Sequence, residues 1–501
     1  MSIIKHFVKV LIPFQFNQSE KEILDNTTVI TGKGKVHSLF NKIGFETIEL
    51  RKGLSDLFSE KKNKSQIMIS YQLDGNVRRI VGLPKKKNGK VFFCCRDKER
   101  VEPYTIEIDD LNVYMFESGV GYAEMEFNYC SCREEDIING NYYLSEIGDK
   151  KNYFLVKHEI WNGETKAKEY EETKFTLLEL LGSILNDVTS KTDFYTELSW
   201  ERIYTKALVY SYLYLDEKPD NFEELLFNLS LNYKESYKVP DKFKSVNESP
   251  EILQQFENSY WIASTNAVTN VSLKTDDEVT NNFFEIDFYS KMHNEYYVLF
   301  LAAIHQRYVL MKLMYEMGEL DQLDLDYFVM KEQLKMARKY QAEAANLKYR
   351  DFFKFPSYVQ HVNDYYDFLY RIFGVEELYA DFTQDLNNIE EICKVYVDKI
   401  NLYDSLKVKL RKATVKTMVS FIGACVGLIT LLNEAWSILE TTCGIPSGTF
   451  SVPVLLVTIA LAIPSVMGVV ETANNAREIW KERRKMETET IGLRKKKQKN
   501  N

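Results

Sequence analysis

Two uncharged apolar segments near the C-terminus constrain this chain more than any other feature. The first, residues 417–432 (TMVSFIGACVGLITLL), has sixteen residues and would extend about 24 Å as an α-helix. The second, residues 451–470 (SVPVLLVTIALAIPSVMGVV), has twenty residues, enough to cross a bilayer. We therefore predict a transmembrane hairpin, with helices over 417–436 and 451–470 joined by an outer loop over 437–450. The alternative is a pair of core helices in a soluble protein.

Basic residues flank the predicted hairpin on one side only. Residues 405–501 carry a net charge of +8, and all of their Lys and Arg residues precede the first segment or follow the second. The outer loop contains Glu440 and no Lys or Arg. By the positive-inside rule, we predict a multi-pass protein of the cell inner membrane, with both termini in the cytoplasm and membrane lipid as one partner. Residues 1–404 carry a net charge of −17, which argues against direct DNA or RNA binding.

The chain before the hairpin is expected to mix strands and helices. Alternation of apolar and polar residues predicts a cytoplasmic α/β domain over residues 1–175. A period of three to four residues then predicts a cytoplasmic helical domain over 176–380 and a stalk helix over 381–416. A basic cytoplasmic tail, 471–501, follows the hairpin. The fold class is thus an α+β N-terminal domain, a helical middle section with a long stalk helix, and a C-terminal two-helix transmembrane hairpin.

The clearest strand signal is VYMFESGVGYAEMEF, which predicts a hairpin turning over Ser118 to Gly121. Two more hairpins are predicted, at Asp74-Gly75 and at Asn88-Gly89. The predicted strands are residues 6–14, 66–73, 78–83, 90–95, 104–108, 112–117, 122–128 and 152–160. The predicted helices before the stalk are residues 176–185, 197–213, 294–316, 326–349 and 358–373. On the third of these, His305 is expected to be a core histidine and not a ligand.

A row of small or polar residues runs along the first apolar segment, at steps of three or four residues. Its members are Thr417, Ser420, Ala424, Gly427 and Thr430, and the last step leads to Asn433 or to Glu434. The stalk below continues the spacing as a mostly apolar seam: Leu386, Ile389, Cys393, Tyr396, Ile400, Tyr403, Lys407 and Leu410. One interpretation is that the row lines a pore formed by several copies, with Asn433 or Glu434 at the outer mouth. The other is that small residues let helices pack closely without conduction.

A local basic cluster lies in the N-terminal domain and includes Arg78, Arg79, Lys85, Lys87 and Arg96. One interpretation is an anion-binding or nucleotide-binding surface. The alternative is that these residues decorate solvated turns and edge strands. The six histidines and seven cysteines match no metal-binding or catalytic motif, so we expect no enzyme activity and no cofactor. A divalent cation stays open as a permeant or regulatory ion, and its ligands are unknown.

The order of these parts resembles the CorA superfamily of divalent-cation channels. The resemblance is strongest over residues 375–485, where VEELYADFTQDLNNIEEICKVYVDKINLYDSLKVKLRKATVKTMVSFIG is similar to the family's stalk and pore entry. It implies a homopentamer, in which residues 417–433 line the pore and the second span lies outside.

The chain departs from the family at the pore mouth. The family's Gly-Met-Asn signature is missing, and the equivalent region reads LLNEAWSILETTCGIPSG. In this respect the chain is similar to divergent CorA-like membrane effectors of type III CRISPR defence, which respond to a nucleotide second messenger. The resemblance thus implies an oligomeric channel or membrane effector gated by a cytoplasmic ligand, plausibly a small nucleotide in antiviral defence. The alternatives are a divalent-cation transporter similar to Mg2+ transporters, or a membrane-anchored receptor or scaffold that does not conduct.

Overall fold

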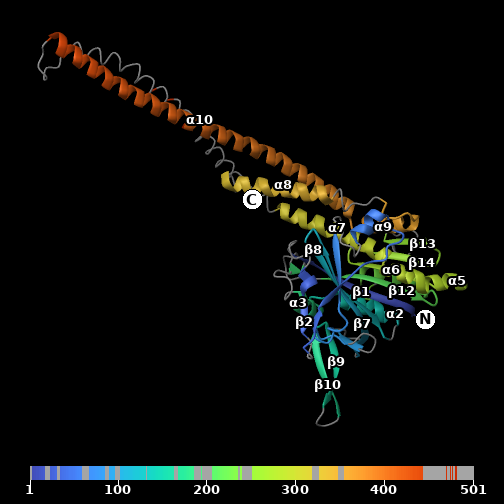
Figure 1. Ribbon diagram of the computed structural model, residues 1–501. Helices are drawn as coiled ribbons and strands as arrows, with labels where there is room; N and C mark the ends of the chain where they lie inside the picture. Colours follow the sequence, from blue (N-terminus) through green and yellow to red (C-terminus); the bar gives the residue numbers. More distant parts are fainter. Residues whose placement is uncertain are drawn as a thin grey trace. The chain divides into compact units, whose positions relative to one another are not determined.

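In the computed structural model, the N-terminal strand β1 (Ile3–Gln15) lies at the centre of a large sheet (Figure 1). The structure describes residues 3–16, 23–30, 34–58, 67–84, 90–95, 102–130, 133–162, 167–185, 193–194, 206–234, 237, 239, 251–318, 327–347, 355–443, 470, 474, 477, 480 and 481. The chain divides into two compact units. The first contains Met1–Tyr315 and Ala344–Thr383, and the second contains Glu316–Glu343 and Gln384–Asn501.

Thirteen strands of the described chain join the sheet, and most neighbours are antiparallel. Its main order is β10-β9-β6-β7-β8-β1-β12-β15-β14-β13. The strands are β4 (Phe40–Ile43), β5 (Met68–Leu73), β6 (Lys90–Cys94), β7 (Tyr104–Phe116), β8 (Val120–Tyr129), β9 (Tyr153–Asn162), β10 (Ala167–Phe175), β11 (Asp193–Phe194), β12 (Leu208–Leu215), β13 (Ile252–Phe256), β14 (Ser259–Ala263) and β15 (Ala267–Leu273), together with β1. A separate ribbon pairs β2 (Thr28–Ile30) with β3 (Val36–Ser38).

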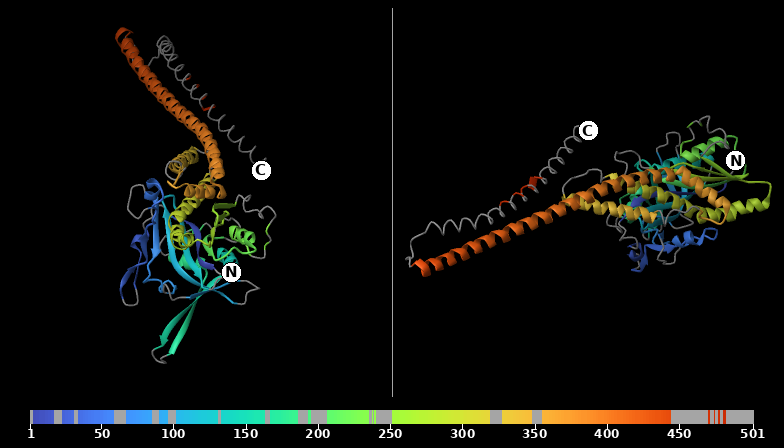
Figure 2. Two further views of the ribbon diagram at one scale, coloured as in Figure 1. Left: turned by 90° about the vertical axis from the view of Figure 1, so that its right-hand side faces the viewer. Right: turned by 90° about the horizontal axis from the view of Figure 1, so that it is seen from above.

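The helices occupy the connections and the C-terminal half. They are η2 (Ile23–Asn26), α1 (Lys52–Leu57), α2 (Glu134–Ser145), α3 (Leu177–Leu185), α4 (Phe222–Leu231), α5 (Glu278–Asn282), the π-helix η5 (Phe283–Phe288), α6 (Tyr289–His293), α7 (Glu295–Gly318), α8 (Tyr327–Asn346), α9 (Gln360–Ile372) and α10 (Val375–Cys443). Gly374, between α9 and α10, has φ 61°, a left-handed conformation that favours glycine and ends α9. From Val375 onward α10 runs without a break in each view (Figures 1 and 2).

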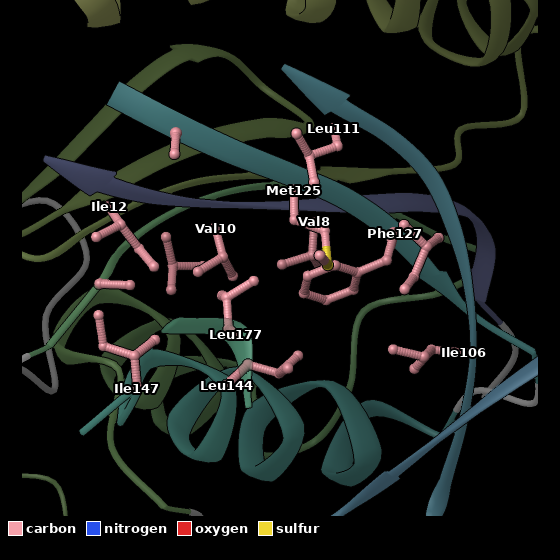
Figure 3. Close-up of a cluster of buried hydrophobic side chains, with 14 of the residues drawn as sticks. Val8, Val10, Ile12, Ile106, Leu111, Met125, Phe127, Leu144, Ile147 and Leu177 are labelled. Atoms are coloured by element: carbon pink, nitrogen blue, oxygen red, sulfur yellow. The ribbon is translucent and has the colours of Figure 1, made fainter. Parts of the chain in front are cut away.

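One face of the sheet is an ordinary apolar core. Alternate residues of β1, among them Val8, Val10 and Ile12, pack with Met125 and Phe127 of β8. Figure 3 shows this cluster above α2 and α3, which contribute Leu144 and Leu177. All of these side chains are buried, so the alternation that predicts a strand here also marks the apolar face.

The opposite face of the sheet is rich in tyrosine and packs against α5, η5, α6 and α7. Strand β12 turns Tyr210, Tyr212 and Tyr214 to this side, away from Val209 and Leu213 in the apolar core. The Tyr210 hydroxyl donates to the Met292 carbonyl at 3.0 Å. The hydroxyl of Tyr212 donates to the Phe284 carbonyl at 2.8 Å, and that of Tyr214 to Asn281 at 3.0 Å. Each buried ring therefore has a partner for its polar end.

Several predicted elements are present. The hairpin over Ser118 to Gly121 joins β7 to β8, and the long helices over 294–316, 326–349 and 358–373 correspond to α7, α8 and α9. The helix predicted over 176–185 corresponds to α3, where Thr176 and Glu179 cap the first turn reciprocally at 3.1 Å and 2.8 Å. The Asn88-Gly89 hairpin lies outside the described residues.

Three local predictions are wrong. Residues 78–83 form successive turns and no strand, because Asp74 accepts the Asn76 N–H at 2.7 Å and Ile80 N–H donates to the Val77 carbonyl. Asp74-Gly75 therefore closes no hairpin, and β5 pairs with β4 and β7. The strands predicted over 104–108 and 112–117 are one strand, β7, with a bulge between Ile108 and Asp110.

The predicted start of a helical domain at residue 176 is also wrong. The helix expected over 197–213 is replaced at its C-terminal end by β12, because the tyrosines alternate with residues of the apolar core and so follow a period of two. Strands β13, β14 and β15, which we did not predict, extend the same sheet beyond β12. Residues 197–205 lie outside the described chain.

His305 generates a prediction on pH dependence. Its ring stacks on Phe116, with centroids 3.8 Å apart, and burial, with a smaller effect from Lys312, lowers its pKa to about 3. When the pH is lowered from 7 to 5, the unfolded chain takes up a proton at this residue and the folded chain does not. The free energy of unfolding therefore decreases as the pH is lowered. In His305→Phe, the loss of unfolding free energy between pH 7 and pH 5 should be smaller by about 2 kcal/mol, measured by urea unfolding.

Other histidines contribute to the same pH dependence, since burial also lowers the pKa of His361. Burial also lowers the pKa of His6, to about 4, so part of the pH dependence should persist in the variant. An unchanged pH dependence in His305→Phe would contradict a neutral, buried His305.

Candidate functional site

α10 contains the candidate membrane span. It is the helix of the described chain that is long and apolar enough to cross a membrane, by length and composition. Its apolar side chains between residues 417 and 432 are exposed, with exposed fractions of 67% for Met418, 58% for Phe421 and 59% for Ile429. An apolar surface of this extent marks a membrane or protein contact. The second predicted span, 451–470, lies outside the described residues except Val470.

The predicted pore-lining row divides into two groups on α10. Thr417, Ser420 and Gly427 are half-buried, whereas Thr430, Asn433 and Glu434 are exposed. The structure does not describe the side chain of Ala424. The row therefore drifts around the helix above Gly427, as its irregular steps require at 3.6 residues per turn.

Local geometry suits these polar residues to an apolar environment. The Thr417 hydroxyl donates to the Ala413 carbonyl and the Thr430 hydroxyl to the Val426 carbonyl, both at 2.7 Å. Each hydroxyl thus has its partner on its own helix. A Cβ atom built on Gly427 meets no heavy atom within 4 Å, so an added Cβ is accommodated there within one copy of the chain.

The stalk seam below the span is partly covered in the second unit. Tyr396 is buried, while Ile400, Tyr403 and Leu410 are half-buried and Lys407 is exposed. Leu386, in the same unit, is half-buried, and the side chains of Ile389 and Cys393 lie outside the description. Within this unit Gln341 of α8 donates to Glu390 of α10 at 3.3 Å.

Of the five residues predicted for anion binding, the structure describes Arg78 and Arg79. Arg78 is buried, and its guanidinium donates to the carbonyls of Pro84, Asp109 and Ile108 at 3.0, 2.8 and 2.5 Å. Burial lowers its pKa although two nearby aspartates oppose this. Arg78 therefore supports the bulge in β7. Arg79 is exposed, and Lys85, Lys87 and Arg96 lie outside the described residues.

A buried ionic network in the first unit was missed by the sequence analysis. Lys9 of β1 lies 3.0 Å from the Glu124 carboxylate and 2.9 Å from that of Glu126, both on β8. His293 of α6 lies 2.9 Å from the second oxygen of Glu126, and its other ring nitrogen faces the Tyr289 carbonyl at 2.8 Å. Both of these oxygens are acceptors, so both ring nitrogens donate when His293 is protonated.

Hydrogen bonds complete the network around Glu124. Asn112 donates to one carboxylate oxygen at 2.8 Å, Tyr114 donates to the other at 2.7 Å, and Tyr297 of α7 also donates to the latter oxygen. Burial alone would lower the pKa of Lys9, but the two carboxylates outweigh it and raise the pKa above its usual value. Burial acts against Glu126 ionisation, yet Lys9 and His293 hold the pKa of Glu126 well below its usual range.

The network is closed and structural. Its charges pair with each other, and the sheet and α7 exclude water from it. Strand β1 carries apolar residues on both faces around Lys9, which is the sequence signal that this lysine would need a buried partner. Among the described residues, no three His, Cys, Asp or Glu side chains come together to hold a metal ion.

Comparisons with solved structures give only a weak likeness. No family model matches this chain, and no curated protein matches it. A solved structure that is similar is the CorA magnesium transporter from Methanocaldococcus jannaschii, with 12% identity over 63% of this chain and 96% of that chain and a TM-score of 0.17. A TM-score this low supports no inference about this chain, so the membrane assignment rests on α10 itself.

Replacing Lys9 tests the network. Lys9→Met leaves two buried carboxylates without their shared cation and should lower the unfolding free energy by about 3–5 kcal/mol, measured by urea unfolding of the full-length protein in detergent. Lys5→Met, on the same strand, is the control. Lys5 is half-buried and contacts the Glu285 carbonyl and the Tyr289 ring, neither of which is a buried charge, so its loss should cost less than about 1 kcal/mol. Equal effects of the two substitutions would contradict a buried, paired Lys9.

Proposed function

We propose that the chain is an oligomeric membrane channel of CorA-like organisation, gated by a ligand that binds its cytoplasmic part. The observation that carries the proposal is α10, a single helix of 69 residues that joins a charged stalk to an uncharged, exposed apolar segment. A helix with such a surface needs lipid around it or further copies beside it.

Gating follows from the continuity of α10. Because no break separates the stalk (381–416) from the span (417–436), a rotation or shift of the stalk moves the span with it. The half-buried row of Thr417, Ser420 and Gly427 supports close helix contacts along the span. In the open state this row and the exposed Thr430, Asn433 and Glu434 would face the pore.

The finer parts of the proposal come from the sequence. They are a second span over 451–470 and, from the basic flanks, an orientation in the cell inner membrane with both termini in the cytoplasm. The resemblance to CorA-like effectors suggests a pentamer and a nucleotide second messenger of type III CRISPR defence as the gating ligand. A divalent cation is the corresponding permeant or regulatory ion. No catalytic step is part of the proposal.

Oligomer mass is the first test. Native mass spectrometry of the detergent-purified protein should give about five times the chain mass of 58.7 kDa. A monomer or dimer would contradict the proposal, because too few spans would be present to enclose a pore.

Tryptophan substitutions test the pore-facing row. Ser420→Trp and Gly427→Trp should assemble and abolish ion flux into proteoliposomes, since a large ring would fill the space between copies. Met418→Trp is the control, because Met418 projects from the side of the helix opposite Ser420 and Gly427. Wild-type flux in both row variants would contradict the pore assignment and favour a non-conducting anchor.

A further inference from the structure

The connection between α9 and α10 is the place where the first unit leads into the helix that contains the candidate span. Two residues, Phe373 and Gly374, separate the end of α9 at Ile372 from the start of α10 at Val375. We call these two residues the stalk joint. The first turns of α10, up to Thr383, belong to the first unit together with α9. The stalk joint therefore lies wholly within the first unit.

Arg307 of α7 binds the stalk joint. Its Nη1 atom donates a hydrogen bond to the Phe373 carbonyl. A Cβ atom built on Gly374 would lie 3.9 Å from the same nitrogen, so the guanidinium lies beside both residues of the joint. Carbonyls at the C-terminal end of a helix carry partial negative charge, and arginine stays protonated in proteins. The contact is therefore a charge-assisted hydrogen bond at the place where α9 ends.

Buried apolar side chains surround this polar contact. Phe373 and Val375 are fully buried, and so is Phe382, two turns into α10. The Phe373 ring lies 6.1 Å from the Phe300 ring of α7, measured between centroids. Arg307 itself is half-buried, which strengthens its hydrogen bond relative to one in water. Helix α7 thus contributes both an aromatic ring and a cation to the joint.

The same helix contacts the hairpin formed by β7 and β8. Lys312 donates to the Ser118 carbonyl, in the turn between the two strands, at 2.8 Å. The His305 ring stacks on Phe116 at the end of β7. His305 and Arg307 are two residues apart, so they project from opposite sides of α7. One side of the helix therefore contacts the hairpin, and the other contacts the stalk joint.

A simple role in capping α9 is the alternative explanation of Arg307. Helix ends are usually capped by their own last residues or by the loop that follows, whereas Arg307 lies 66 residues before Phe373. In addition, Gln306 of α7 donates to the Tyr366 hydroxyl of α9 at 3.1 Å, so α9 has a bond to α7 without Arg307. The bond from Arg307 falls on the joint itself.

We infer that Arg307 is a positioning residue for the stalk. By binding the stalk joint it couples the start of α10 to α7 and, through α7, to the β7–β8 hairpin. A shift of α7 on the sheet then moves the first turns of α10. As a gating device this coupling rests on the channel function proposed above; as a property of the first unit it is tested without that function.

Hydrogen–deuterium exchange of the full-length protein in detergent, read by mass spectrometry, tests the coupling. The amides of residues 378–383 form the first hydrogen bonds of α10, starting with that from Leu378 to the Gly374 carbonyl. In Arg307→Met these amides should exchange about tenfold faster than in the wild type, because the bond that holds the joint is lost. Arg307→Lys keeps a cationic donor and should restore most of the protection.

Lys312→Met is the matched control on the same helix. Because Lys312 donates at the β7–β8 turn, its loss should leave exchange over residues 378–383 at the wild-type rate. Wild-type exchange over these residues in Arg307→Met, or an equal increase in Lys312→Met, would overturn the coupling. An increase spread over the whole first unit would also overturn it, because Arg307 would then contribute to overall stability and not to the joint.

A second substitution tests the backbone of the joint. Gly374 has φ 61°, which alanine rarely adopts, while an added Cβ would meet its nearest heavy atoms at 3.6 and 3.9 Å, in ordinary contact. Gly374→Ala should therefore speed exchange over residues 378–383 through backbone strain. Gly374→Asn should do so less, because asparagine adopts the left-handed conformation more readily. Wild-type exchange in Gly374→Ala would contradict a joint held in this conformation.

Ion flux separates the coupling from the channel. In proteoliposomes, Arg307→Met should change the basal Mg2+ flux about fivefold or more, and Arg307→Lys should return it toward the wild-type value. A loosened joint with unchanged flux through a conducting wild type would overturn the gating role of Arg307. Absence of flux in the wild type would contradict the channel alone, because the exchange measurement still decides whether Arg307 holds the joint.

Discussion

The fold of the first unit depends on the burial of one lysine in the middle of its sheet. Lys9 is 3% exposed and pairs with two carboxylates of β8. A shift of β1 by one residue against β8 would turn Lys9 into the apolar core and leave Glu124 and Glu126 unpaired. Because Tyr297 and His293 bind the same carboxylates, the network also aligns α6 and α7 on the sheet. One ionic contact thus fixes both strand register and helix placement.

Much of the architecture was predictable from local patterns. The alternation in β1 and around the β7–β8 turn identified strands, and the period of α7, α9 and α10 identified helices. The predictions failed where the same residue pattern is typical of two different structures. The tyrosines of β12 fit a helical face as well as a strand, and Glu124 and Glu126 resemble the solvated side of an edge strand until a lysine from β1 is found opposite them. Arg78 looked like a surface cation because its carbonyl partners on β7 are distant in sequence.

The candidate sites also differed in how far the sequence predicts them. The span in α10 was visible because hydrophobicity over a membrane thickness is a one-dimensional property of the sequence. The buried network around Lys9 was not visible, because Lys9, Glu126 and His293 come together only through the pairing of β1 with β8 and the packing of α6 on the sheet. Basic residues that were adjacent in sequence suggested an anion site, and the structure gives Arg78 a backbone role.

The central position of β1 has a consequence for synthesis of the protein. The strand is made before its two neighbours, β8 and β12, and Leu11 pairs with Leu208 across nearly 200 residues of sequence. A nascent chain grows by about 5–20 residues per second, so one edge of β1 stays unpaired for several seconds after β8 has docked. An open apolar strand edge is a template for pairing with neighbouring chains. The sheet of this protein is therefore most exposed to aggregation on the ribosome, before any apolar helix reaches the membrane.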